Sequence, residues 1–264
     1  MNRRAPVALA MVVAMSLGCQ RADSSRTSQR PRRVELSVFA ASSLLEAFSA
    51  LEQAFERSHP HIDVRLTFAG SQVLRLQTEM GAEVDVFASA NEDHMAALVE
   101  AELIADSLPL ALNELVVIVP ISNPAGIERF EDLLNAKRIV LGADNVPAGV
   151  YAQQVLANAE TPLGADFVAR VRRHVVSRES NVRLVRAKVE LGVADAAFVY
   201  RTDASASERV RMISIPDPVG VRARYFIGRG SAGAKQAFAE QFIRFSRSPA
   251  GQALLTRLGF RALP

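Results

Sequence analysis

An apolar strand followed by a turn of small residues and then by a helix recurs along this sequence. In the first copy, a strand at residues 34–39 and small residues at 40–43 lead into apolar side chains at helical spacing: Leu44, Leu45, Phe48, Leu51 and Phe55. This alternation predicts an α/β fold with mostly parallel sheets flanked by helices. The helix starts then gather at one edge of the sheet, where ligands bind in such folds.

Ser43 and Ser71 begin the first two predicted helices, after strands at residues 34–39 and 62–68. Ser43 and Glu46 have the S-x-x-E spacing of a capping box, which predicts Ser43 as the N-cap of its helix. A helix start presents unpaired N–H groups, and a serine hydroxyl adds a donor without adding a charge. Each serine alone is more often structural, but together they suit a small anion.

Two further junctions offer backbone donors. Pro147 suits a first helical turn, so Ala148 presents its N–H at the start of that helix. Asn181 suits an N-cap, which leaves the N–H of Val182 free. Tyr200 ends a buried strand at residues 196–199, from which its hydroxyl could reach the same edge. Its ordinary role there is that of a tyrosine at the edge of the core.

The N-terminus has the features of an export signal. Arg3 and Arg4 precede an apolar stretch at residues 5–17, which is too short to span a bilayer. The stretch ends in S-L-G-C at Cys19, which resembles a bacterial lipobox, in which the cysteine is lipidated. An ordinary signal peptide with an incidental cysteine is the alternative. Polar residues 20–33 are predicted to be a disordered tether. We therefore expect an exported protein, in the periplasm or at the cell surface, anchored through Cys19.

The charge of the chain is unevenly distributed. The net charge is +3, but residues 1–33 hold seven arginines and one aspartate, so residues 34–264 hold 24 basic and 27 acidic side chains. A slightly acidic body without Trp argues against a nucleic-acid surface. Cys19 is the only cysteine. The body therefore has no thiol for a disulfide, a zinc site or nucleophilic catalysis.

Six short motifs resemble, in order and spacing, those of the periplasmic molybdate-binding proteins of ABC transporters. They are F-A-A-S-S-L at 39–44, F-A-G-S at 68–71, D-V-F-A-S-A at 85–90, V-P-A-G-V-Y-A at 146–152, N-V-R at 181–183 and V-Y-R-T-D-A at 199–204. The resemblance runs from Val34 to Phe260 and includes the family's C-terminal helix. Each motif alone is weak, whereas the ordered set is specific. Asn91 stands where the family usually has Asp.

The resemblance implies a two-lobed periplasmic binding protein fold of type II, with the ligand in the cleft between the lobes. Residues 34–111 and 219–264 would form lobe one, and residues 112–218 lobe two, after a signal peptide at 1–19 and a tether at 20–33. The resemblance also implies that hydroxyl and backbone N–H groups hold the oxyanion, at Ser43, Ser71, Ala148, Val182 and Tyr200. Because Ser42 adjoins Ser43, which of these two serines faces the anion is open.

The implied function is capture of molybdate, and also of tungstate, by a monomer that delivers it to an ABC permease and ATPase in the inner membrane. No cofactor and no bare metal ion are expected. A site made only of donors excludes a protonated anion such as phosphate, because the proton needs an acceptor. Sulfate is fully ionised, as molybdate is, so a receptor of the same fold for sulfate or another small oxyanion is the alternative.

Two other functions are disfavoured. Iron receptors commonly use clustered tyrosines, and this chain has three tyrosines in all. No G-x-S-x-G, Walker or H-E-x-x-H motif is present, and none of the four histidines has a Ser, Cys or carboxylate partner at a recognisable spacing. We therefore expect that the protein is not an enzyme.

Overall fold

The structure, a computed structural model, describes residues 33–263. The predicted signal peptide, the lipobox-like Cys19 and the predicted tether up to residue 32 lie outside the described residues. Within residues 33–263, no helix combines the length and the apolar character that crossing a membrane requires.

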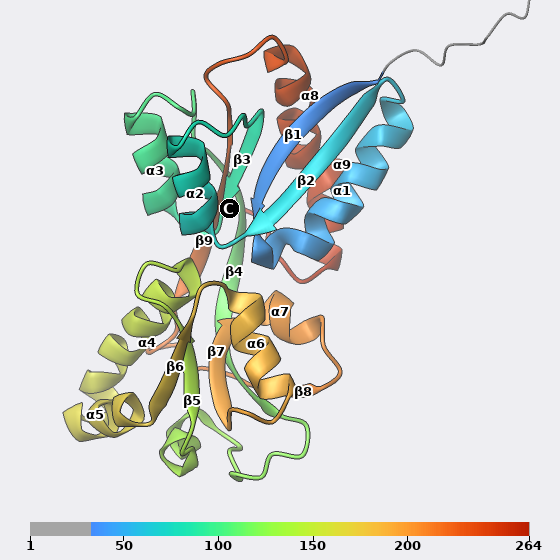
Figure 1. Ribbon diagram of the computed structural model, residues 1–264. Coiled ribbons are helices and arrows are strands. Elements are labelled where there is room, and N and C mark those ends of the chain that lie inside the picture. The colour runs from blue at the N-terminus through green and yellow to red at the C-terminus, as the bar shows by residue number, and fades with distance from the viewer. Residues whose placement is uncertain (1–32, 264) are drawn as a thin grey trace, which may run out of the picture. The chain divides into compact units, whose positions relative to one another are not determined.

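Strands and helices alternate through most of the described chain (Figure 1). The strands are β1 (Val34–Ala41), β2 (Ile62–Ala69), β3 (Val86–Ser89), β4 (Leu108–Pro120), β5 (Ile139–Gly142), β6 (Val175–Glu179), β7 (Ala196–Tyr200), β8 (Val210–Ile213) and β9 (Arg222–Arg229). The α-helices are α1 (Leu45–Ser58), α2 (Ser71–Glu79), α3 (Glu92–Glu100), α4 (Pro147–Leu163), α5 (Ala165–Arg173), α6 (Val182–Glu190), α7 (Arg201–Ser205), α8 (Gln236–Arg247) and α9 (Pro249–Arg257). Short 3-10 helices occupy Ser42–Leu44 and Phe130–Asn135.

The strands form two groups that share β4. In the first group the order is β2-β1-β3-β9-β4, with β1 parallel to β2 and β3 and with β9 antiparallel to β3 and β4. In the second group the order is β4-β7-β5-β6, with β5 parallel to β6 and β7. β4 runs antiparallel to β7 and to β8. The predicted α/β class is confirmed, and each group combines three parallel strands with antiparallel neighbours.

β4 joins the two groups because its two halves have different partners. Residues 108–114 pair with β9, and from Leu115 onward the strand pairs with β7. The register places Glu114 opposite Arg222 and Leu115 opposite Tyr200. The chain therefore passes from one sheet to the other between Glu114 and Leu115, without a loop. The lobe limits of residues 111/112 and 218/219 stay a prediction.

The apolar residues of the short strands and of α1 are buried, as their sequences lead one to expect. β3, β5 and β7 are buried at every residue, as expected of short strands that are covered by helices on both faces. The helical spacing of the first motif is also confirmed, because Phe48, Leu51 and Phe55 of α1 are completely buried. Phe55 packs edge-to-face on Phe242 of α8, with ring centroids 5.2 Å apart. α1 thus covers its sheet together with α8 and α9, while α2 packs with α3 (Figure 1).

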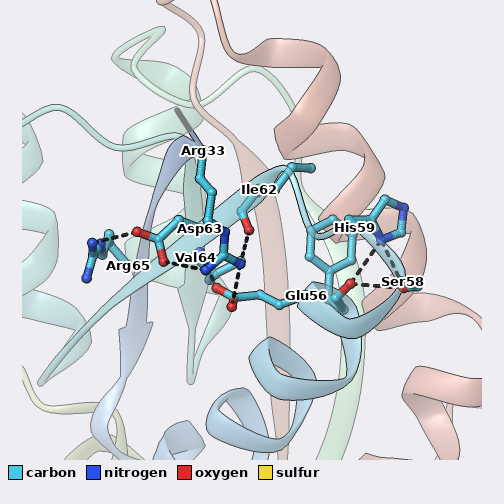
Figure 2. A network of polar contacts seen from close by, with 9 residues as sticks. Arg33, Glu56, Ser58, His59, Ile62, Asp63, Val64 and Arg65 are labelled. Carbon is cyan, nitrogen blue, oxygen red and sulfur yellow. Dashed lines mark hydrogen bonds and ion pairs between the residues drawn. The ribbon is translucent and has the colours of Figure 1, made fainter. Parts of the chain in front are cut away.

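A network of polar contacts connects the first described residue to α1 and β2 (Figure 2). The Arg33 guanidinium donates to the Glu56 carboxylate at 2.7 Å, and the other Glu56 oxygen accepts from the Val64 N–H at 2.7 Å. Asp63 lies between Arg33, at 3.6 Å, and Arg65, at 2.5 Å. Most of these side chains are partly exposed, so each ion pair stabilises the fold only slightly. Their role is to fix the start of β1 beside β2.

Candidate functional site

The turn after β1 brings two buried serines to the edge of the first sheet. Ser42 and Ser43 lie in the 3-10 helix, and α1 begins only at Leu45. The predicted capping box is wrong, because no side chain caps either helix. The hydroxyl of Ser43 instead accepts a hydrogen bond from the Tyr225 hydroxyl at 2.9 Å. Glu46 pairs with Arg183.

Ser71 is the first residue of α2, as predicted, and follows the N-cap Gly70. The side chain is 1% exposed, and its Oγ accepts from the Ala90 N–H at 3.1 Å. Gly70 packs closely against the turn before α6, since a Cβ on Gly70 would lie 2.5 Å from the Ser180 carbonyl oxygen. Gln72 donates to the same carbonyl at 2.6 Å. A side chain at position 70 would therefore push this contact apart.

The start of α4 is placed by close backbone packing. Pro147 is the first residue of the helix, and Ala148 the second, so the Ala148 N–H has no partner within the helix. A Cβ at Gly149 would lie 2.2 Å from the Ala143 carbonyl oxygen. Glycine at this position lets the helix start approach the end of β5. Ala148 is buried, with 1% of its surface exposed.

The start of α6 has the predicted cap. The Asn181 side chain accepts from the Leu184 N–H at 3.0 Å, which confirms Asn181 as the N-cap. Val182 is then the first helical residue, and its N–H also has no partner within the helix. At the end of β7, Tyr200 is 1% exposed. Its hydroxyl makes no hydrogen bond of normal geometry within residues 33–263, although the Tyr225 hydroxyl lies near enough to raise its pKa.

These residues surround one small cavity, in which about 10 Å³ is open to the centres of water-sized atoms. All five residues predicted for the site line it, and so does Ser42. The complete lining is Ala41, Ser42, Ser43, Gly70, Ser71, Ala90, Val146, Pro147, Ala148, Asn181, Val182 and Tyr200. None of these described residues carries a charged side chain. Sites for drug-sized ligands are usually larger than about 300 Å³, so the space suits a small ion or molecule.

The hydroxyl groups near the cavity keep their protons. Burial raises the pKa of Tyr200 well above its ordinary value of 10, and the neighbouring Tyr225 adds to this effect. Burial likewise raises the pKa of Tyr225. Both tyrosines are therefore neutral near pH 7, and each hydroxyl can donate a hydrogen bond. Together with the helix-start N–H groups, they give the cavity a lining of neutral donors.

The three tyrosines of the chain lie next to one another. The Tyr200 ring contacts Tyr225 with centroids 5.6 Å apart and Tyr151 with centroids 6.3 Å apart. The sequence did not indicate this clustering, which iron receptors commonly show. Only Tyr200 lines the cavity, because the Tyr225 hydroxyl bonds Ser43 and the Tyr151 hydroxyl accepts from the Arg224 N–H at 3.2 Å. Within the described chain, no group of three His, Cys, Asp or Glu side chains could hold a metal ion.

Three contacts connect the two sides of the cavity at its rim. Arg183 at the start of α6 donates to both oxygens of Glu46, at 2.9 and 3.0 Å. The His94 Nε2 lies 2.8 Å from the carbonyl oxygen of Asn145, just before α4, and must donate there because a carbonyl only accepts. The Gln72 contact with Ser180 is the third. Each contact spans more than 50 residues of sequence, which is why none was predicted.

Asp203 is a buried carboxylate that the sequence did not single out. It lies in α7 and is 2% exposed, and neither oxygen has a hydrogen-bond partner among the described residues. Burial raises its pKa to about 7, although Arg186 and Arg183 act in the opposite direction. The side chain is therefore partly protonated near neutral pH. It is not part of the cavity lining.

Two α/β sheets that share one crossing strand, with a cavity formed by helix starts from both, define the class of two-lobed substrate-binding proteins. Residues 36–261 match the family model described as bacterial extracellular solute-binding protein. The chain belongs to this family.

Curated relatives match part of the chain. "Putative ABC transporter substrate-binding lipoprotein YvgL" of Bacillus subtilis is 34% identical over 142 residues, which cover 53% of this chain and 54% of the relative. "Molybdate-binding protein ModA" of Mycobacterium tuberculosis is 33% identical over 150 residues, which cover 55% of this chain and 58% of the relative. The chain thus spans about half the length of the curated relatives it matches.

Solved structures match nearly all of the described chain. The "substrate binding domain of putative molybdenum ABC transporter" from Clostridium difficile has a TM-score of 0.67 at 27% identity, covering 88% of this chain and 100% of the other. The periplasmic molybdate-binding protein of Azotobacter vinelandii scores 0.74 at 21% identity, covering 87% and 99%. The sulfate-binding protein SubI of Mycobacterium tuberculosis scores 0.77 at 19% identity, covering 88% of both chains. The predicted two-lobed fold of type II is confirmed.

Proposed function

We propose that this protein is an extracytoplasmic receptor that captures molybdate, and also tungstate, and delivers it to an ABC importer. One observation carries the proposal: the five residues named from the sequence line one small cavity from both sheets, and the described residues of the lining offer neutral donors and no charged side chain. Several curated relatives are named as molybdate-binding proteins, which supports this choice of ligand.

Neutral donors suit a fully ionised oxyanion. A buried Lys or Arg would have to lose its hydration, whereas N–H groups at helix starts are already fixed in place by the fold. Each hydrogen bond to a charged group contributes on the order of 1.5 to 3 kcal/mol. Five such bonds are enough for tight binding after the cost of closing the two sides over the anion is subtracted.

We propose that Ser43, Ser71 and Tyr200 donate hydroxyl hydrogens to the anion, and that Ala148 and Val182 donate backbone N–H groups. The Tyr200 hydroxyl supports this assignment, because a buried hydroxyl without a partner is costly unless a ligand or water completes it. Ser42 also lines the cavity. Because the Ser43 hydroxyl already accepts from Tyr225, its own hydrogen is available to the ligand.

We further propose that the remaining properties follow those of ABC substrate-binding proteins. The protein would act as a monomer with a permease and an ATPase as partners, and it would need no cofactor and catalyse no reaction. Export would be followed by anchoring through a lipidated Cys19. The name of the YvgL relative, a lipoprotein, supports this last point.

Calorimetric titration of the purified protein with molybdate, tungstate, sulfate and phosphate at neutral pH tests the proposal. We expect one molybdate or tungstate per chain to bind tightly, sulfate to bind far more weakly and phosphate to bind more weakly still. Ser71→Ala should weaken molybdate binding by roughly ten- to a hundredfold.

Preferential binding of sulfate would make the protein a sulfate receptor of the same fold. Binding of none of the four anions would refute the proposal, and the five residues would need another explanation. Wild-type affinity in Ser71→Ala would remove Ser71 from the site.

A further inference from the structure

Tyr225 lies directly behind the candidate site, although nothing in the sequence motifs includes it. It belongs to β9 and its side chain is completely buried. Its hydroxyl lies 2.9 Å from the Oγ of Ser43, 182 residues away in the sequence. Its ring packs edge-on against Tyr200 and against Phe260, with a centroid distance of 5.4 Å to Phe260. One buried side chain thus contacts two of the proposed ligand groups.

The direction of the bond between Tyr225 and Ser43 follows from the partners available. Within residues 33–263, the Tyr225 hydroxyl donates to Ser43 Oγ. The Asn113 amide donates to Thr202 at 2.9 Å, and it also lies close enough to Tyr225 to lower its pKa as a hydrogen-bond donor. Burial raises the pKa of Tyr225, so that proton is retained at neutral pH. Tyr225 therefore donates, and Ser43 accepts.

A serine hydroxyl has one hydrogen and two lone pairs. With one lone pair of Ser43 facing Tyr225, its hydrogen must point elsewhere, and Ser43 lines the cavity. Ser71 has the same arrangement, since its Oγ accepts from the Ala90 N–H. In both serines, a donor from the protein itself occupies one lone pair of the hydroxyl oxygen. Each hydroxyl keeps its hydrogen and one lone pair for the other directions, so its hydrogen is available to an anion in the space between the two serines.

We propose that Tyr225 is a specificity-determining residue: by donating to Ser43 it favours the orientation in which the Ser43 hydroxyl donates toward the cavity, so a protonated oxyanion finds no acceptor at Ser43. The inference rests on the proposed oxyanion function, and it adds the residue that decides whether the Ser43 hydroxyl donates or accepts toward the ligand. Without the Tyr225 hydroxyl, Ser43 could rotate and accept the proton of a hydrogenphosphate ion. Tyr225 acts through Ser43 and is a positioning residue.

Tyr225→Phe tests this inference because it removes the hydroxyl and keeps the ring that packs on Tyr200 and Phe260. We expect the ratio of molybdate to phosphate affinity, measured by calorimetric titration at neutral pH, to fall about tenfold. Tyr151→Phe is the matched control. It removes a hydroxyl from the same tyrosine cluster that bonds the Arg224 N–H and does not line the cavity, so the ratio should stay unchanged.

A double-mutant cycle shows whether Tyr225 acts through Ser43. Ser43→Ala alone should weaken molybdate binding, and Tyr225→Phe should then change the affinity by less than about twofold in the Ser43→Ala background. Loss of packing alone would instead reduce the affinity equally in both backgrounds. Thermal unfolding of each variant checks that the fold is retained.

The two proposals fail in different ways. A wild-type protein that binds none of the oxyanions overturns the proposed function and the role of Tyr225 together. If the wild type binds molybdate but Tyr225→Phe keeps the wild-type ratio of molybdate to phosphate, only the Tyr225 inference is overturned. The same holds if the effects of Tyr225→Phe and Ser43→Ala simply add. Ser43 then directs its hydrogen away from the anion, toward the second hollow that it borders with Glu46 and Arg257.

Discussion

Individual hydrogen-bonding groups decide what the cavity can hold. The sequence indicated Ser43, Ser71, Ala148, Val182 and Tyr200, because each follows a strand at a helix start or ends a strand. The structure places all of them around one cavity. The sequence could not indicate Tyr225, since a tyrosine in an alternating strand has an ordinary core role. Its significance arises from a contact between residues that are 182 positions apart.

The Val182 N–H can be removed without disturbing the helix. Proline is favoured at the first helical position, and Asn181 has the extended conformation that a residue before proline adopts. We therefore expect Val182→Pro to fold and to bind molybdate at least about tenfold more weakly, because one hydrogen bond to the anion is lost. Calorimetric titration measures the affinity, and circular dichroism verifies the helix content.

Val182→Ala is the control for this experiment. It shortens a buried side chain and keeps the N–H, so the affinity should remain within a few-fold of the wild type. If Val182→Pro folds and retains wild-type affinity, the backbone N–H of Val182 does not contact the anion.

Helices and strands were predicted best where the pattern is local. The starts of helices α1, α2, α4 and α6 were found, and so were strands β1, β2 and β7, since apolar runs and helix starts are marked within a few residues. Several elements were missed: the first half of β4, all of α5, β6, β8 and β9, and α8. β6 alternates partly buried and exposed residues at the sheet edge. β9 carries exposed arginines, and its partners β3 and β4 lie more than 100 residues away.

The capping box failed for a related reason. The S-x-x-E spacing of Ser43 and Glu46 predicts a local contact, but both side chains have distant partners, Tyr225 and Arg183. An ion pair across the rim and a buried hydroxyl bond compete with the local cap. Tertiary structure, which the spacing does not encode, decided the outcome.

The contact of α3 with the loop before α4 should depend on pH. Burial lowers the pKa of His94 below its ordinary value of 6.5, and the Arg75 guanidinium, 3.5 Å from Nδ1, acts in the same direction. The Asn145 carbonyl and the carboxylates of Asp93 and Glu79 act in the opposite direction. His94 is therefore neutral in the folded protein near pH 7.

Because the folded pKa is the lower one, the unfolded chain binds more protons below pH 6.5. The stability that neutral His94 contributes is complete above pH 6.5 and declines as the pH falls toward the folded pKa. We expect the free energy of unfolding, measured by urea denaturation, to fall more steeply between neutral and mildly acidic pH in the wild type than in His94→Gln.

The comparison isolates His94, because Asp203 and the other titrating groups are common to both proteins. Equal slopes in the wild type and in His94→Gln would show that the imidazole does not gain a proton on unfolding in this range.

At the scale of the whole molecule, β4 makes the two sheets one continuous structure. The fold class and the two-lobed architecture were predictable, since the ordered motifs resemble one family over most of the chain. The position at which β4 passes from one sheet to the other was not predictable, because Leu108–Pro120 is a single extended strand whose two halves differ only in their partners.

Cys19 decides where the whole molecule resides if the proposed lipidation is correct. Cys19→Ala removes the atom that would carry the lipid, so we expect the exported protein to move from the membrane fraction to the soluble fraction. Fractionation of cells followed by immunoblotting measures this change. A wild-type protein that is already soluble after export would refute the anchoring.

The tyrosine cluster gives the molecule an optical property of its own. The chain has no tryptophan, and its three tyrosines, Tyr151, Tyr200 and Tyr225, lie side by side at the candidate site. Apart from the weak emission of phenylalanine, all intrinsic fluorescence of the protein therefore comes from this tyrosine cluster. An anion that bonds the Tyr200 hydroxyl would alter the emission directly, without a label and without background from the rest of the fold.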